Sequence, residues 1–294
     1  MKLLPAMLVA ACLGGCTGER HEGPADIGPA SRIVTLAPHL TELVFTVGAG
    51  NQLVGVVAHS DYPEAAQSLP VIGDAFRIDP ERLAAVEPDL VLAWAGGNPA
   101  ETVNQLLDRG YRVVSLPADA LTDVAANLVQ IGALTGHETV ARAMADEYLQ
   151  VLEQRRRQSM TGRPLRVFYQ ISPQPLYTVG GRHPISEMIR LCGGQNVFAD
   201  LEQLAPAVSL EAVLARDPQV IIAAMPGGEL QQWHRWADMA AVAGEALYTV
   251  DASLVSRPST RMLQGLQQLC AHLEAVRISS PDAETPPVAI EPRP

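Results

Sequence analysis

Short apolar runs alternate with amphipathic segments along most of this chain. Each run is unbroken and only a few residues long, as expected of strands that are buried on both faces of a parallel sheet. The predicted strands are residues 32–36, 53–57, 90–93, 111–116, 165–171, 220–224 and 247–250. Helical periodicity is predicted for residues 42–47, 99–109, 121–134, 185–191 and 261–274, with a further helix possible over 229–237. This alternation predicts an α/β fold with parallel, doubly wound sheets.

One stretch of this pattern occurs twice. The first copy runs from Asp79-Pro80-Glu81 through an apolar strand to Gly96-Gly97, and the second runs from Ser209-Leu210-Glu211 to Gly227-Gly228. Each copy begins with a helix-capping residue and a first-turn glutamate, passes a proline, and then gives a strand, a Gly-Gly turn and another helical segment. The repeat predicts two related Rossmann-like lobes.

A long helical pattern separates the two copies. Residues 137–158 contain no internal Pro or Gly, and an apolar stripe includes Val140, Met144, Tyr148 and Leu152. We expect this segment to be a single rigid helix of about 30 Å that bridges a first lobe at 31–136 and a second lobe at 159–275. One rigid bridging helix limits hinge opening. Residues 276–294 are predicted to be a disordered tail.

Composition narrows the function. The chain has 294 residues, of which 48% are hydrophobic and 18% charged, and its formal net charge is -11. This length and composition suffice for two lobes with their own cores. The acidic balance argues against a nucleic-acid partner, because such partners require a basic surface.

The N-terminus has the layout of a secretory signal. Lys2 is followed by an apolar run too short to span a bilayer, and the run ends in Leu13-Gly14-Gly15-Cys16. A cysteine at this place resembles a bacterial lipoprotein box. We therefore expect residues 1–15 to be a lipoprotein signal peptide, Cys16 to carry the lipid, and residues 16–30 to be a flexible tether. The alternative is an ordinary cleaved signal with an incidental cysteine.

Two cysteines remain in the exported chain. An even pair in an oxidising compartment favours a disulfide between Cys192 and Cys270, and the alternative is two buried free thiols. Neither cysteine lies at a spacing typical of metal sites.

Ligands of parallel α/β sheets lie at the carboxyl ends of the strands. At these ends the chain has no Gly-x-Ser-x-Gly elbow, no P-loop and no dinucleotide-binding glycine motif. Tyr62 and Trp94 each follow a strand, so their rings could project into a cleft or pack against their own lobe. His39 and His59 could bind a metal, although solvated loop histidines are more common. Trp233 and Trp236 are expected to be packing residues.

Several motifs together resemble the cobalamin branch of the periplasmic-binding proteins that serve ABC importers of iron-siderophores and cobalamin. They are Arg32-Ile33-Val34-Thr35-Leu36-Ala37-Pro38, Ser60-Asp61-Tyr62-Pro63, Pro88-Asp89 through Trp94 to Asn98, Tyr177 to Gly181, Leu191 to Phe198, and Ser256-Arg257-Pro258. The resemblance covers residues 32–273. It implies the class III fold, with two α/β lobes joined by one helix, and a corrinoid bound in the cleft without covalent chemistry.

The resemblance also implies roles for individual residues. Tyr62 and Trp94, with the turn at Gly96 and Gly97, match ligand-contacting positions on the first lobe, and Tyr177 matches an aromatic of the second lobe. Glu81 and Glu211 match surface acids that dock onto arginines of the permease, although without the resemblance both are ordinary first-turn acids. Cys192 and Cys270 match the family disulfide.

Three departures from the family pattern leave the ligand open. Phe76, beside Ala75, stands where a tryptophan is common, a second-lobe tryptophan is missing near Ala205, and a polar contact falls on Ser253. The prediction is therefore a periplasmic, lipid-anchored, monomeric binding protein for cobalamin or another corrinoid, with no cofactor and no bound metal. The alternatives are a haem or ferric-siderophore binder of the same class and, less favoured, an exported hydrolase.

Overall fold

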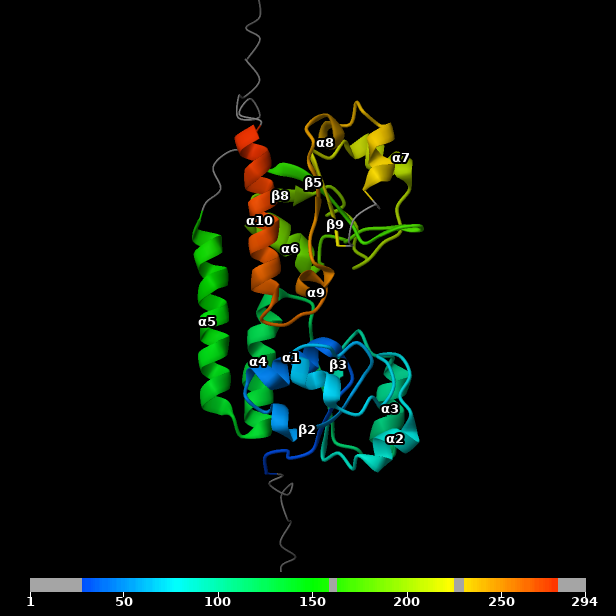
Figure 1. The fold of residues 1–294 in the computed structure, drawn as a ribbon, viewed down its shortest axis with the longest axis vertical. Helices are drawn as coiled ribbons and strands as arrows, with labels where there is room; N and C mark the ends of the chain where they lie inside the picture. Colours follow the sequence, from blue (N-terminus) through cyan, green and yellow to red (C-terminus); the bar gives the residue numbers. More distant parts are fainter. Residues whose placement is uncertain (1–27, 159–162, 225–229, 280–294) are drawn as a thin grey trace, which may run out of the picture.

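A computed structural model describes residues 28–158, 163–224 and 230–279. The predicted signal peptide, the lipidation site Cys16, most of the tether, the second Gly-Gly turn and the chain beyond residue 279 lie outside the described residues. Two lobes lie one above the other and are joined along one side by long helices (Figure 1). The predicted class III fold is confirmed.

Strands and helices alternate in both lobes. The first lobe and the bridging helix consist of β1 (Ile33–Thr35), α1 (Pro38–Thr46), η1 (Gly50–Gln52), β2 (Leu53–Val56), η2 (Glu64–Ser68), α2 (Pro80–Ala85), β3 (Leu90–Trp94), α3 (Ala100–Asp108), β4 (Val113–Leu116), α4 (Leu121–Thr135) and α5 (Glu138–Arg157). The second lobe consists of β5 (Leu165–Gln170), β6 (Ser172–Pro173), β7 (Leu176–Tyr177), α6 (Pro184–Leu191), β8 (Gly194–Asn196), α7 (Leu210–Arg216), β9 (Val220–Ala223), η3 (Gln231–Arg235), α8 (Ala240–Ala243), β10 (Leu247–Thr249), α9 (Ala252–Val255) and α10 (Met262–Ser279).

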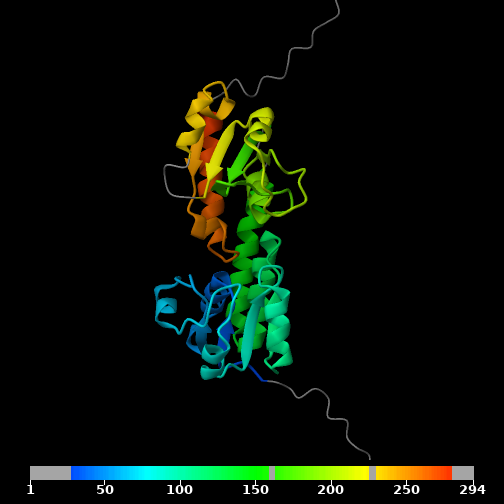
Figure 2. The same cartoon turned by 90° about the vertical axis from the view of Figure 1, so that its right-hand side faces the viewer.

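The two lobes repeat one topology. The first sheet has the order β2-β1-β3-β4 and the second has the order β8-β5-β9-β10 when it is read from the opposite edge. All pairings in both sheets are parallel. In the second lobe the strands point toward the first lobe (Figure 2). The carboxyl ends of these strands therefore face the gap between the lobes, where ligands of such sheets bind.

Side-chain contacts reproduce the sequence repeat. Arg32, just before β1, donates from Nε to the carbonyl of Glu87 at 3.0 Å, and Arg166 of β5 donates from Nε to the carbonyl of Asp217 at 2.9 Å. Glu87 and Asp217 both have a left-handed φ, of 41° and 40°, and both precede a proline. The predicted duplication is thus present down to single hydrogen bonds.

The bridging helix α5 forms as predicted, but its buried stripe differs from the predicted one. Ala141, Ala145, Tyr148 and Leu152 are buried, whereas Val140 is exposed. The reason is the close approach of α4: a Cβ added at Gly132 would lie only 2.2 Å from the Cβ of Ala141. Only small residues fit where the helices touch, so the alanines face α4.

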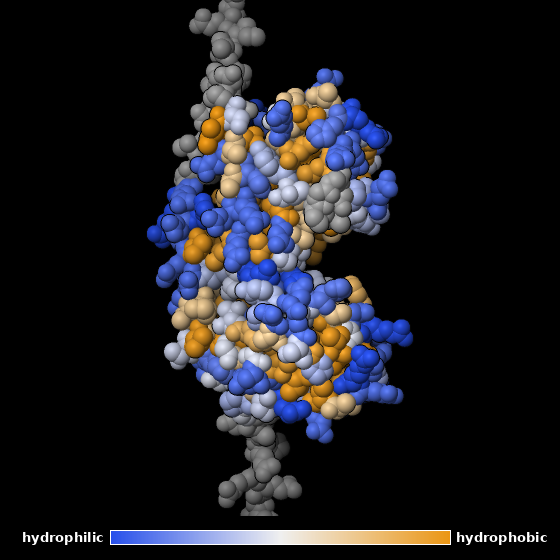
Figure 3. Space-filling view, viewed as in Figure 1, coloured by the Kyte–Doolittle hydropathy of each residue, from blue (hydrophilic) through white to orange (hydrophobic). Residues whose placement is uncertain are grey.

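One apolar core spans both lobes on the side of α4, α5 and α10, and separate clusters cover the opposite face of each sheet. The surface is hollowed between the lobes on the side away from α5 (Figure 3). The lobes are therefore held together along one side and open on the other, which leaves a cleft.

Three predicted boundaries are wrong. Helix α1 begins at Pro38 and not after Thr41, because proline suits the first position of a helix. Helix α10 continues to Ser279 with Val276 buried, so the tail cannot begin at residue 276. Ala30, predicted to be tether, is buried and donates its N–H to the carbonyl of Leu134 at 2.8 Å.

The predicted disulfide is present. Cys192 and Cys270 are joined by an S–S bond of 2.03 Å, which ties the end of α6 to α10. The predicted packing role of Trp233 is confirmed as well: the ring is buried against Phe168 and its Nε1 donates to Gln170 at 2.8 Å. In residues 28–158, 163–224 and 230–279, no helix has both the length and the apolar character that a membrane span requires.

Candidate ligand-binding site

Trp94 ends β3 and folds back over the turn that follows it. The N–H groups of Gly97 and Asn98 donate to the Trp94 carbonyl at 3.2 and 3.0 Å. A Cβ added at Gly97 would lie 1.9 Å from the Trp94 ring, and Gly96 has a left-handed φ of 81°. The two glycines therefore shape the turn so that the half-buried Trp94 ring can lie across it. Their predicted contact with a ligand stays a prediction.

Asn98 holds this turn in place, a role that its position in the sequence did not reveal. Its Oδ1 accepts from the N–H of Trp94 at 2.6 Å, while its Nδ2 donates to the carbonyls of Leu36 and Ala75 at 2.9 and 2.8 Å. Asn98 is only 7% exposed, so these bonds are sheltered from water. Asn98 thus connects the ends of β1 and β3 to the segment that carries Phe76, whose ring is 72% exposed.

His39, in α1, packs against Trp94. Its ring meets Trp94 edge to face with centroids 5.2 Å apart. Burial, assisted by the charge of Arg257, lowers the pKa of His39 to about 3, so the imidazole is neutral. His59 is exposed and has a left-handed φ of 67°. In the described part of the chain no three His, Cys, Asp or Glu side chains form a group that could hold a metal ion.

Tyr62 and Ser253 belong to different lobes, and one cation connects them. The guanidinium of Arg261 lies 4.0 Å above the centroid of the Tyr62 ring, and its Nη2 donates to the Ser253 hydroxyl at 3.1 Å. Tyr62 nevertheless remains 46% exposed. The structure therefore brings together two predicted ligand residues through an arginine that the sequence analysis did not single out.

A second arginine crosses between the lobes beside the first. Arg257 donates to both carboxylate oxygens of Asp61 and, at 3.3 Å, to Glu42. The hydrogen bond from Arg257 holds the pKa of Asp61 below its usual value. The sequence offered one signal for this pair, because both residues occur in motifs of the family resemblance, but nothing in the sequence indicated that they meet.

Tyr177 lies on the second lobe, in a short hairpin that follows β5. Its carbonyl accepts from the N–H of Ile171 at 2.9 Å, and strand β7 pairs with β6. The ring is 36% exposed. Tyr177 is therefore placed at the carboxyl end of β5, as a cleft residue requires, but no described contact joins it to Tyr62 or Trp94.

Glu81 and Glu211 occupy matching places outside the cleft. Both are exposed in the first turn of a helix: Asp79 caps α2 by accepting from the N–H of Glu81 at 2.9 Å, and Ser209 caps α7 by accepting from the N–H of Ala212 at 3.2 Å. Hydrogen bonds from its own N–H and from Ser209 lower the pKa of Glu211. Helices α2 and α7 lie on the side of the molecule where the cleft opens (Figure 1).

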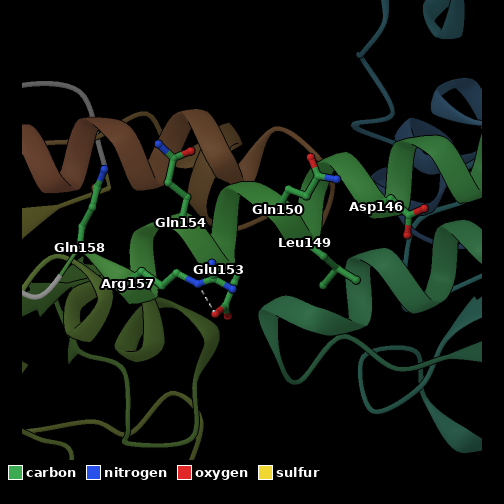
Figure 4. A pocket seen from close by; sticks show the side chains of 7 residues that line it. All are labelled: Asp146, Leu149, Gln150, Glu153, Gln154, Arg157 and Gln158. Carbon is green, nitrogen blue, oxygen red and sulfur yellow. Dashed lines mark hydrogen bonds and ion pairs between the residues drawn. The ribbon is translucent and has the colours of Figure 1, made fainter.

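Two hollows in the surface lie away from these residues. One, of about 580 Å³, follows the exposed face of α5, where Leu149 and the ion pair of Glu153 and Arg157 line it (Figure 4). The other, of about 570 Å³, borders α6 in the second lobe and includes Arg182 and Glu187. None of the predicted ligand residues lines either hollow.

Comparison with known proteins decides the family. Residues 33–254 match the family described as periplasmic binding protein. The chain belongs to this family. Over 250 residues the chain is 35% identical to the vitamin B12-binding protein of Vibrio cholerae. This match covers 84% of this chain and 90% of the relative. The crystal structure of the periplasmic vitamin B12-binding protein BtuF of Vibrio cholerae superposes with a TM-score of 0.78 at 33% identity, covering 85% of this chain and 98% of that one.

Haem binders share the fold as well. The structure of a periplasmic haem-binding protein from Pseudomonas aeruginosa superposes with a TM-score of 0.73 at 25% identity, covering 83% of this chain and 92% of that one. The predicted resemblance to the cobalamin branch is confirmed by the sequence relatives, which are named for vitamin B12.

Proposed function

We propose that this protein captures cobalamin or a related corrinoid between its lobes and delivers it to an ABC importer. The observation that carries the proposal is the 35% identity with a vitamin B12-binding protein over 90% of that relative's length. The site is chemically suitable: the exposed rings of Tyr62 and Tyr177 and the half-buried ring of Trp94 lie at strand ends of the two lobes. Aromatic rings can cover a large flat macrocycle with little loss of side-chain entropy.

Capture by such a cleft requires no chemical step. Its contacts are rings, hydroxyls and arginines paired with carboxylates, and the family consists of binding proteins. We therefore propose a binding protein and not an enzyme, working as a monomer without a cofactor. Recovery of unaltered ligand after incubation is expected, and a converted product would contradict this assignment.

Calorimetric titration of the purified protein with cyanocobalamin tests the proposal. We expect a one-to-one complex with a dissociation constant below about 1 µM. A dissociation constant of 1 µM corresponds to a binding free energy of about -8 kcal/mol. Trp94→Ala and Tyr62→Ala should each weaken binding at least about tenfold. Trp236→Ala is the matched control, because Trp236 packs against Trp233 in the second lobe. Absence of heat and of fluorescence change at micromolar ligand would refute cobalamin capture.

A haem ligand is the second candidate, and the Pseudomonas aeruginosa structure favours including it. Haem iron takes a tyrosine or histidine ligand, and Tyr62 and His59 are exposed near the cleft loops. Titration with haemin followed at the Soret band separates the two ligands. A Soret shift lost in Tyr62→Phe or His59→Ala, without cobalamin binding, would favour haem.

We propose that Glu81 and Glu211 dock the protein onto arginines of the permease. Their matched, exposed positions on the two lobes support this, since charge complementarity directs association. Reversing both charges should leave ligand affinity unchanged and weaken association with permease in vesicles. Glu101→Lys, which reverses another exposed first-turn acid, on α3, is the control. Equal effects of the two changes would contradict specific docking.

We also propose that Cys16 carries a lipid and holds the protein to the periplasmic side of a membrane. The support is the sequence Leu13-Gly14-Gly15-Cys16 after a short apolar run. Cells grown with labelled palmitate should incorporate label into the wild type and not into Cys16→Ser. Labelling that persists in the variant would refute the anchor.

A further inference from the structure

Glu42 is a buried acid at the boundary between the lobes. It lies in α1 of the first lobe and is 3% exposed. Its carboxylate accepts from the Ser259 hydroxyl at 2.5 Å and from Nη1 of Arg257 and Arg261 at 3.3 Å each. All three donors belong to the second lobe. A carboxylate buried this deeply is stable only with such partners, so the contacts fix the position of both arginines.

Both arginines continue from Glu42 to residues that border the cleft. Arg257 binds Asp61, and Arg261 lies over the Tyr62 ring and binds Ser253. The path from Glu42 to Tyr62 therefore has a single intermediate, the guanidinium of Arg261. Glu42 is the most deeply buried carboxylate of this group and the one that pairs with both arginines, whose side chains are 18% and 16% exposed. Loss of the Glu42 charge would remove the carboxylate that holds the two guanidiniums side by side.

We propose that Glu42 is a positioning residue for the ligand site: through Arg261 it fixes the Tyr62 ring, and through both arginines it sets the distance between the lobes before ligand arrives. The part that concerns the ligand rests on the proposed function. A ring already fixed in its bound position loses less freedom on binding, and this preorganisation strengthens the complex.

The substitution Glu42→Gln tests the proposal because it keeps the shape and removes the charge. Nitroxide labels on keto-phenylalanine at Asp108 and Ala215, which leave the native cysteines untouched, report the distance between the lobes. Both positions are exposed, on α3 and α7, which flank the mouth of the cleft (Figure 1). In ligand-free protein, double electron-electron resonance should give a narrow distribution of the distance between the two labels for the wild type and a broader one for Glu42→Gln. Asp200→Asn, which breaks an acid-arginine pair within the second lobe, should leave it narrow.

Cyanocobalamin affinity provides the second measurement. Glu42→Gln should weaken binding about tenfold in the wild-type background and clearly less in the Tyr62→Ala background, because the part of its effect that passes through Arg261 to the Tyr62 ring is then already lost. If Glu42→Gln does not fold, Arg261→Gln replaces it: Glu42 keeps Arg257 and Ser259, while Tyr62 loses its cation.

The outcomes separate the two proposals. An unchanged distance distribution in Glu42→Gln, or an equal loss of affinity with and without Tyr62, overturns the role of Glu42. If the wild type does not bind cobalamin, the proposed function fails, while the distance measurement in ligand-free protein still decides whether Glu42 sets the lobe geometry.

Discussion

The turn after β3 makes a sharp prediction about Gly97. A methyl group in Gly97→Ala would lie 1.9 Å from Cδ2 and 2.0 Å from Cε3 of Trp94. Ordinary carbon contacts begin at about 3.5 Å, so the ring has to move by about 1.5 Å. This movement breaks the edge-to-face contact with His39, whose centroid is 5.2 Å away. Such ring pairs contribute about 0.5–1.5 kcal/mol, so we expect a stability loss of about 1 kcal/mol.

Gly96→Ala is the matched control. A Cβ at Gly96 meets nothing within 4 Å, but the φ of 81° disfavours any residue with a side chain. The cost of that conformation is also about 1 kcal/mol. The two variants should therefore unfold at similar urea concentrations, while only Gly97→Ala displaces the Trp94 ring.

Indole N–H signals in a proton-nitrogen NMR spectrum distinguish the two variants. The chain has three tryptophans, and Trp94→Phe identifies the Trp94 signal by its loss. That signal should shift in Gly97→Ala and stay in place in Gly96→Ala, and ligand affinity should fall about tenfold in Gly97→Ala. An unmoved Trp94 signal in Gly97→Ala, or equal shifts in both variants, would refute the role given to Gly97.

Three further predictions concern stability. Replacing Cys192 and Cys270 together by serine should lower the free energy of unfolding by about 4 kcal/mol, because the disulfide closes a long loop. Urea unfolding measures this loss, and a loss below about 1 kcal/mol would contradict the prediction. His39 has a pKa lowered by burial to about 3, against 6.5 in the unfolded chain, so its neutral burial stabilises the fold above pH 6.5 and this contribution is lost as the pH falls toward 3. His39→Phe should therefore flatten the fall in urea midpoint between pH 7 and pH 5. The hydrogen bond from Arg257 lowers the pKa of Asp61 below 3.8. The pair therefore stabilises the fold above pH 3.8, and this stabilisation is lost as the pH falls through the lowered pKa. In Asp61→Asn the fall of the melting temperature with pH should be smaller only below about pH 4.

The fold was largely predictable because its signals are local. Each buried strand is an unbroken apolar run, and the repeat showed that the same unit is used twice. The errors have local causes too. Helix α1 begins at Pro38 because proline is favoured in the first turn, and α5 turns its alanines inward because Gly132 brings α4 so close.

The site was predictable only in part. Tyr62 and Trp94 were candidates because each follows a strand and the carboxyl ends of parallel strands meet at one edge, but the ligand role of both, and that of Tyr177, was predicted only from the family resemblance. The contact of Glu42 with Arg257 joins residues 215 positions apart in the chain, and no periodicity encodes such a pair. Asn98 was part of a known motif, but its three hydrogen bonds depend on how β1, β3 and the Phe76 segment come together.

The most direct test of the account is a crystal structure of the protein with cyanocobalamin. We predict the corrin between the lobes, in contact with Tyr62 and Trp94 on one side and Tyr177 on the other, with Arg261 still over the Tyr62 ring. A corrinoid bound elsewhere, for instance in the hollow along α5, or a cleft that stays empty at saturating ligand would contradict it (Figure 4).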